Sequence, residues 1–151
     1  MSNEIIKEIA EAVKVEIENF ASVVDGLPVE VVRKYHDPTS LAKGKVFVTV
    51  YPLTKQKSSN GRAGKQSIVS IYVAIQRSLS PSDTDAVEAM ITYREDLDDH
   101  FETAGKMGCG THVINDDEQP LWFPKQLHQK NRFVSLLALD YSWVARRGGA
   151  S

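Results

Sequence analysis

Residues 45–77 read KVFVTVYPLTKQKSSNGRAGKQSIVSIYVAIQR, and this stretch decides the fold. Val46, Val48 and Val50 alternate with other residues, which predicts a strand over 45–51 that ends at Pro52. A second alternating strand is predicted over 67–77. The residues between them, 54–66, carry four positive charges and no acidic residue, and contain the hairpin turn sequence Asn60-Gly61. We therefore expect two strands joined by a projecting basic β-hairpin arm or loop over 54–66.

Helical patterns lie on both sides of this hairpin. Apolar residues recur at spacings of three and four over 3–20 and again over 83–102, where Ser80-Pro81-Ser82 supplies a capping sequence. Further strands are predicted at 29–35 and at 132–144, the latter apolar on both faces like a central strand. The connections between the first three strands are too short for helical crossovers, so we expect antiparallel pairing. The pattern predicts an α+β fold in which a mostly antiparallel sheet of four to five strands packs against two amphipathic helices.

Composition limits the classes of protein that fit. The chain has 151 residues, 42% of them hydrophobic, which suits one domain over 1–145 followed by a flexible tail over 146–151. The net charge of −2 argues against a surface that grips nucleic acid all round. A single cysteine excludes an internal disulfide and favours a reducing compartment. No apolar run is long enough to cross a membrane.

No motif for catalysis is complete. Residues 61–67, GRAGKQS, are similar to a phosphate-binding loop, but the first required glycine falls at Ser59 and the hydroxyl after the lysine is replaced by Gln66. Cys109, His112 and His100 form only one Cys-x-x-His spacing, whereas structural zinc needs four ligands. We expect no enzyme activity, no cofactor and no bound metal.

Charge separation is the most distinctive feature of the sequence. Two groups of opposite sign are candidate contacts with another subunit or partner: Lys55, Lys57, Arg62 and Lys65 in the basic loop, and Glu95, Asp98, Asp99 and Glu102 in the second helix. They suit head-to-tail association of identical subunits, which closes into a ring when the rotation permits. Pairing within one subunit, or an ordinary mobile basic loop, is the alternative.

The order of these elements resembles the tail terminator, or tail completion, proteins of long-tailed bacteriophages. The matching pieces are the helix over 5–20, the strand 45–52 ending in Pro52, the basic loop 55–65, the strand 68–77 ending in Arg77, the helix over 83–101 and the last strand over 132–141. The segment 105–130 matches least.

The resemblance implies a virion structural protein that forms a ring, a homo-oligomer and usually a hexamer, at the head-proximal end of the tail. It implies a tail tube protein and a head–tail connector protein as partners. DNA would pass through the lumen without sequence readout, and the protein would assemble in the host cytoplasm. The alternatives are a small nucleic-acid-binding module that uses the basic 55–65 loop, and a metal-dependent enzyme built on the acidic helix.

Overall fold

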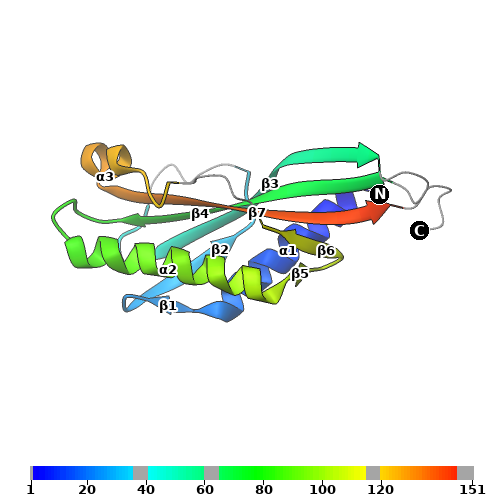
Figure 1. Ribbon diagram of the computed structural model, residues 1–151. Helices are drawn as coiled ribbons and strands as arrows, with labels where there is room; N and C mark the ends of the chain where they lie inside the picture. Colours follow the sequence, from blue (N-terminus) through cyan, green and yellow to red (C-terminus); the bar gives the residue numbers. More distant parts are fainter. Residues whose placement is uncertain (1, 36–40, 60–64, 115–119, 146–151) are drawn as a thin grey trace.

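The fold is α+β, as expected, and consists of a seven-stranded sheet with three helices (Figure 1). The computed structural model describes residues 2–35, 41–59, 65–114 and 120–145. The turn sequence Asn60-Gly61 and the predicted tail 146–151 lie outside these residues. In chain order the elements are α1 (Ser2–Phe20), β1 (Val23–Val24), β2 (Leu27–Val32), β3 (Val46–Ser59), β4 (Lys65–Ser78), α2 (Thr84–Ala104), β5 (Lys106–Met107), β6 (Gly110–Val113), α3 (Pro124–Lys130) and β7 (Arg132–Ala145).

Three strands of 14 residues each form the centre of the sheet. β4 pairs antiparallel with β3 on one side and with β7 on the other, and all 14 residues of β4 have a partner in β7. The prediction that the first of these strands ends at Pro52 is wrong. The register shifts between Pro52 and Thr54, and this bulge lets β3 continue to Ser59 because the proline needs no ladder bond there.

The predicted sheet differs from the observed one at its edges. The strand order is β1-β2-β3-β4-β7-β6-β5, so the sheet has more strands than expected. β2 runs parallel to β3, which corrects the expectation that the first three strands pair antiparallel throughout. Thirteen residues separate Val32 from Val46, and this length of chain is enough to bring β3 alongside β2 in the same direction. The short β1 and β5 and the helix α3 were not predicted.

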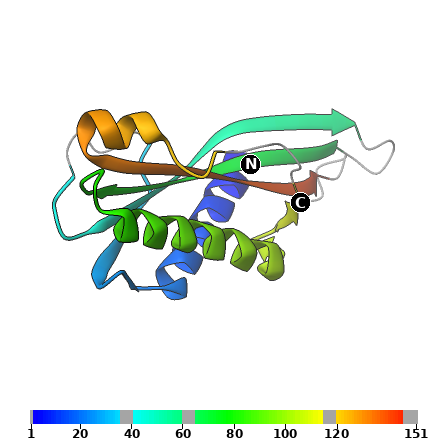
Figure 2. The ribbon, with the colours of Figure 1, turned by 60° about the vertical axis from the view of Figure 1, so that its left-hand side comes forward.

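One face of the sheet is covered by both long helices, as expected (Figures 1 and 2). Alternate residues of the three long strands point to this face, among them Val48, Val73 and Leu137, and they are fully or almost fully buried. From the helices, α1 contributes Ile9, Val13 and Ile17 to the same core, and α2 contributes Met90, Leu97 and Phe101. α3 lies on the other side of the sheet, at the end of β7 where that strand begins.

Local interactions explain where α2 begins and where it ends. The side chain of Asp83 accepts a hydrogen bond from the backbone N–H of Ala86 at 3.1 Å, which caps the first turn. At the other end, Gly105 adopts φ +75° and its N–H donates to the carbonyl of Phe101. This conformation favours glycine, and the helix stops there.

Gly110 lies where α1, β6 and β7 approach one another most closely. A Cβ at this position would lie 2.9 Å from Ile9 Cδ1 and 3.0 Å from Tyr141 Cβ. We predict that Gly110→Ala destabilises the protein by about 1–3 kcal/mol, because the buried neighbours must move to admit one methyl group. Chemical denaturation measures the free energy of unfolding, and the neighbouring exposed Thr111→Ala is the control. Equal stability of the two variants would contradict the packing described here.

Candidate functional site

The outer ends of the three long strands form an arm, which we define as residues 54–59, 65–70 and 140–145. Thr54, Ser70 and Asp140 are aligned across the strands at its base, and Ser59, Lys65 and Ala145 at its end. In Figure 2 the ends of β3 and β4 extend past both long helices. The described residues of the predicted basic loop, 54–59 and 65–66, are therefore regular strand.

Two of the predicted basic contact residues lie on the helix side of this arm. Lys55 is opposite Val69 and Tyr141 in the ladder, and Lys57 is opposite Ser67 and Trp143. Lys55 Nζ lies 5.8 Å from the centre of the Trp143 ring, a cation–π contact that the sequence did not reveal. Partial burial, and secondarily the charge of Lys57, lower the pKa of Lys55. Arg62 and the side chain of Lys65 lie outside the described part of the chain.

The predicted acidic contact residues form a row on α2. Arg94 Nη1 donates to Glu95 Oε1 at 2.7 Å and is itself almost fully buried. Burial raises the pKa of Asp98, and the carboxylate of Glu102 adds to this effect, while Arg94 opposes it. Asp99 and Glu102 are exposed. The four carboxylates of the row repel one another, since all of them carry negative charge.

The structure does not bring the two described lysines of the basic group into contact with the acidic group of the same subunit. Among the described residues, no ion pair links Lys55 or Lys57 with Glu95, Asp98, Asp99 or Glu102. Charge pairing between these groups inside the subunit, one of the alternatives left open by the sequence, is thus absent for the two described lysines.

The outer edge of β3 is open along most of its length. β2 pairs with β3 only from Val46 to Thr49, and no other described strand lies beside the following ten residues. An open edge presents unpaired backbone N–H and C=O groups to a partner. Pro52, the adjacent bulge and the two lysines are features that prevent indiscriminate pairing at such an edge.

The face of the arm opposite the helices is also uncovered by any described element (Figure 1). Tyr51 and Tyr72 stack on this side of the sheet with ring centres 6.0 Å apart. Ser70 Oγ donates to Asp140 Oδ1 at 2.6 Å next to them. The stacked tyrosines therefore lie on the face away from Lys55 and Lys57, beside a carboxylate.

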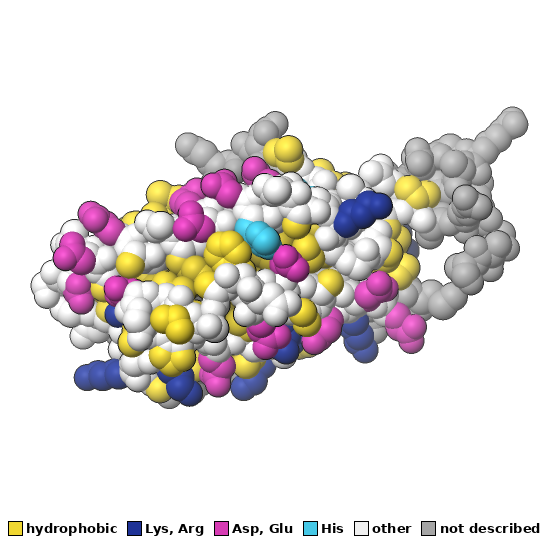
Figure 3. Space-filling view, turned by 90° about the horizontal axis from the view of Figure 1, so that it is seen from below, with side chains coloured by type: hydrophobic (Ala, Val, Ile, Leu, Met, Phe, Trp, Pro, Cys, Tyr) yellow, Lys and Arg dark blue, Asp and Glu magenta, His cyan; other side chains and the backbone are white. Residues whose placement is uncertain are grey.

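A groove of about 550 Å³, which the sequence does not predict, lies between α1 and the turn that follows β5. Its floor contains the apolar side chains of Ala12, Val15 and Met107. Its charged lining consists of Glu8, Glu11, Glu16 and Lys106. The surface that shows the helices carries such a mixture of acidic and apolar side chains (Figure 3). The groove could not be found from spacing, because its two walls are far apart in the sequence.

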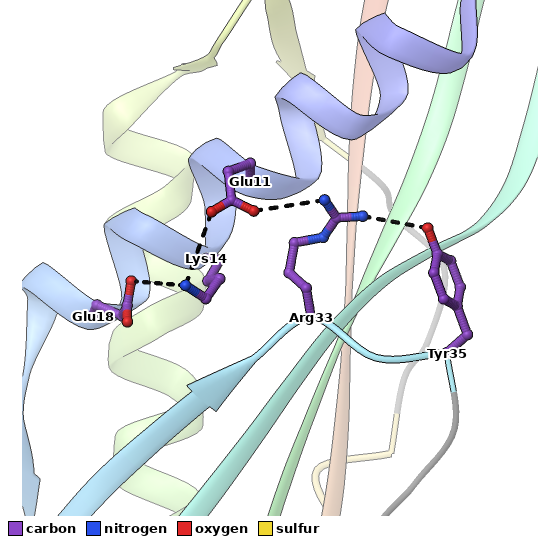
Figure 4. A network of polar contacts seen from close by, with 5 residues as sticks. All are labelled: Glu11, Lys14, Glu18, Arg33 and Tyr35. Atoms are coloured by element: carbon purple, nitrogen blue, oxygen red, sulfur yellow. Dashed lines mark hydrogen bonds and ion pairs between the residues drawn. The ribbon is translucent and has the colours of Figure 1, made fainter.

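The carboxylates of the groove differ in how far they are neutralised within the chain. Figure 4 shows Glu11 between two cations, with Arg33 Nη1 at 3.6 Å and Lys14 Nζ at 3.9 Å. Glu16 Oε1 lies 2.7 Å from His100 Nε2. Glu8, in contrast, has no ion pair with any described residue, and its charge, after burial, raises the pKa of the nearby Cys109 thiol.

The residues considered for metal or nucleophile chemistry are not gathered into one site. His112 packs edge-on against Tyr141 with ring centres 5.4 Å apart, His100 pairs with Glu16, and Cys109 is exposed. A raised thiol pKa is the opposite of what a cysteine nucleophile requires. Within the described ranges, no three His, Cys, Asp or Glu side chains are close enough to hold a metal ion.

Comparison of the chain with family models and with curated proteins finds no match in either. None of the described helices combines the length and the apolar character needed to cross a membrane.

We predict that Asp98→Asn stabilises the protein at about pH 7, by at most about 0.5 kcal/mol because the site is partly exposed. The raised pKa of Asp98 means that the folded state disfavours the charged carboxylate. The stability of the wild type is therefore highest below the pKa that Asp98 has in the unfolded chain, and it falls as the pH rises through the pKa of Asp98 in the folded chain. The gain should therefore vanish at about pH 3. Thermal unfolding at both pH values measures the gain in stability, and Asp96→Asn at an exposed position is the control. A gain that persists at about pH 3 would show that the charge of Asp98 is not its cause.

Proposed function

We propose that this chain is a virion structural and assembly protein. It forms a homo-oligomeric ring at the head-proximal end of a phage tail, and the resemblance to tail terminator proteins implies a hexamer. There it ends polymerisation of the tail tube protein and joins the tail to the head–tail connector, with DNA passing through the lumen. The arm supplies the observation that carries this proposal: its open edge and uncovered face are contact surfaces without a partner in the described chain.

The distribution of charge supports association between unlike surfaces. α1 contains five glutamates and two lysines, and α2 contains seven acidic residues and Arg94 as its basic residue. The remainder of the chain is basic, since the whole has a net charge of only −2. Complementary surfaces of this kind fix the register of an assembly and speed encounter.

Binding of nucleic acid by the basic 55–65 loop is the second candidate function. The contact of Lys55 with Trp143 places a cation beside an aromatic ring, as single-strand binding surfaces do. The acidic helical layer disfavours it, because phosphates would meet carboxylates on a large part of the surface. Salt-dependent binding of single-stranded DNA by the isolated subunit would favour this candidate over the first.

The proposal predicts a native mass of several times the 16.8 kDa subunit, measured by size-exclusion chromatography with light scattering. Shortening the arm should abolish this assembly. Replacing 56–68 by Asn-Gly joins the paired residues Lys55 and Val69 by a two-residue hairpin turn and leaves the helix-covered core intact. We expect a folded chain at the mass of one subunit.

A milder replacement is the matched control. Replacing only 58–66 by Asn-Gly joins the paired residues Lys57 and Ser67, and this variant keeps both lysines of β3. It should retain the assembly. Addition of the wild-type ring to polymerising tail tube protein should stop tube growth, as seen by electron microscopy. A wild-type chain that remains a single subunit at high concentration would overturn the proposed function.

A further inference from the structure

The groove between α1 and β5 has the chemistry of a lysine-binding surface. Lysine combines a long aliphatic stem with a terminal cation, and it buries the stem against apolar surface while its charge meets carboxylates. Val15 is 44% exposed on the groove floor, and Glu8 is an unneutralised carboxylate beside it. The charge of Glu16 adds to burial in raising the pKa of the Tyr141 hydroxyl, a further sign of negative potential in this region.

The open edge of β3 presents the complementary groups. Lys57 is exposed and forms no ion pair with a described residue. Lys55 lies two residues before it in β3 and therefore on the same face of the strand. Their mutual repulsion contributes to the lowered pKa of Lys55. Neither Lys57 at this edge nor Glu8 in the groove therefore has an ion-pair partner among the described residues.

We propose that this groove binds the β3 edge of a second copy of the chain, with Lys57 of one copy paired with Glu8 of the next and its aliphatic stem against the apolar lining. The inference rests on the proposed function and names the contact that joins neighbouring subunits. The contact we propose is head-to-tail, because it joins two different patches. An open chain of subunits then keeps one free edge at one end and one free groove at the other until a ring closes.

The groove fits the arm better than the acidic row of α2 does. The buried Arg94 partly neutralises the row. It donates a hydrogen bond to Glu95, and its charge opposes the rise in the pKa of Asp98 that burial and the neighbouring carboxylates cause. The groove offers a hollow with an apolar floor. Twofold pairing of two β3 edges is also disfavoured, since it would set lysines against lysines.

Exchange of the two charges tests this contact. Lys57→Glu places a carboxylate against Glu8, and Glu8→Lys places a cation against Lys57, so each variant alone should need an about tenfold higher concentration to assemble than the wild type. An equimolar mixture should assemble like the wild type, because every interface of an alternating ring then joins opposite charges. Light scattering against concentration is the measurement, and circular dichroism confirms that both variants fold.

Two control variants complete the design. Lys43 is exposed and lies outside the described strands, so Lys43→Glu should not affect assembly. Asp99→Lys tests the row on α2, and it should not restore assembly of the Lys57→Glu variant. Restoration by Asp99→Lys in place of Glu8→Lys, or unchanged assembly of both single variants, would overturn the inference while the ring itself stands. A monomeric wild type would instead remove the proposed function and this contact with it.

Discussion

The length of the three central strands is the constraint on which the rest of the molecule depends. Fourteen residues of β-strand extend about 46 Å at 3.3 Å per residue, whereas the 19 residues of α1 extend about 28 Å at 1.5 Å per residue. The helices are therefore shorter than the strands that they cover, and the ends of β3 and β4 extend past them in Figure 2. The ladder between β4 and β7 is continuous, so this outer part stays ordered strand and forms the arm.

The composition of the arm follows from this exposure. Its helix side still needs a buried layer, which Val69, Tyr141 and Trp143 supply. Its outer edge must stay soluble, and the bulge after Pro52 together with Lys55 and Lys57 prevents pairing with arbitrary strands. An edge protected by charge accepts a partner of opposite charge more readily than a neutral one, so the same lysines both prevent aggregation and select the partner.

Local pattern explains which parts of the fold were predictable. The long helices and the last strand follow directly from residue periodicity, because each buries one regular face. Two-residue strands such as β1 and β5 contain no period that could be read, and the parallel pairing of β2 depends on the path of a connection rather than on its residues. The sequence predicts a strand end at Pro52, because the bulge that lets the strand continue depends on the partner strand.

The candidate site likewise contains features that the sequence predicts and features that only the fold brings together. The charges of Lys55, Lys57 and the α2 row are visible in the sequence, but Trp143 beneath Lys55 and the groove between α1 and β5 depend on long-range packing. The fold places most negative charge on the helical layer and leaves positive charge on the arm. Contact between like surfaces of two copies would bring equal charges together, whereas contact between unlike surfaces neutralises them. Electrostatics therefore favours contact of the arm with the helical layer of another copy, and the head-to-tail ring that we propose provides this contact at every interface.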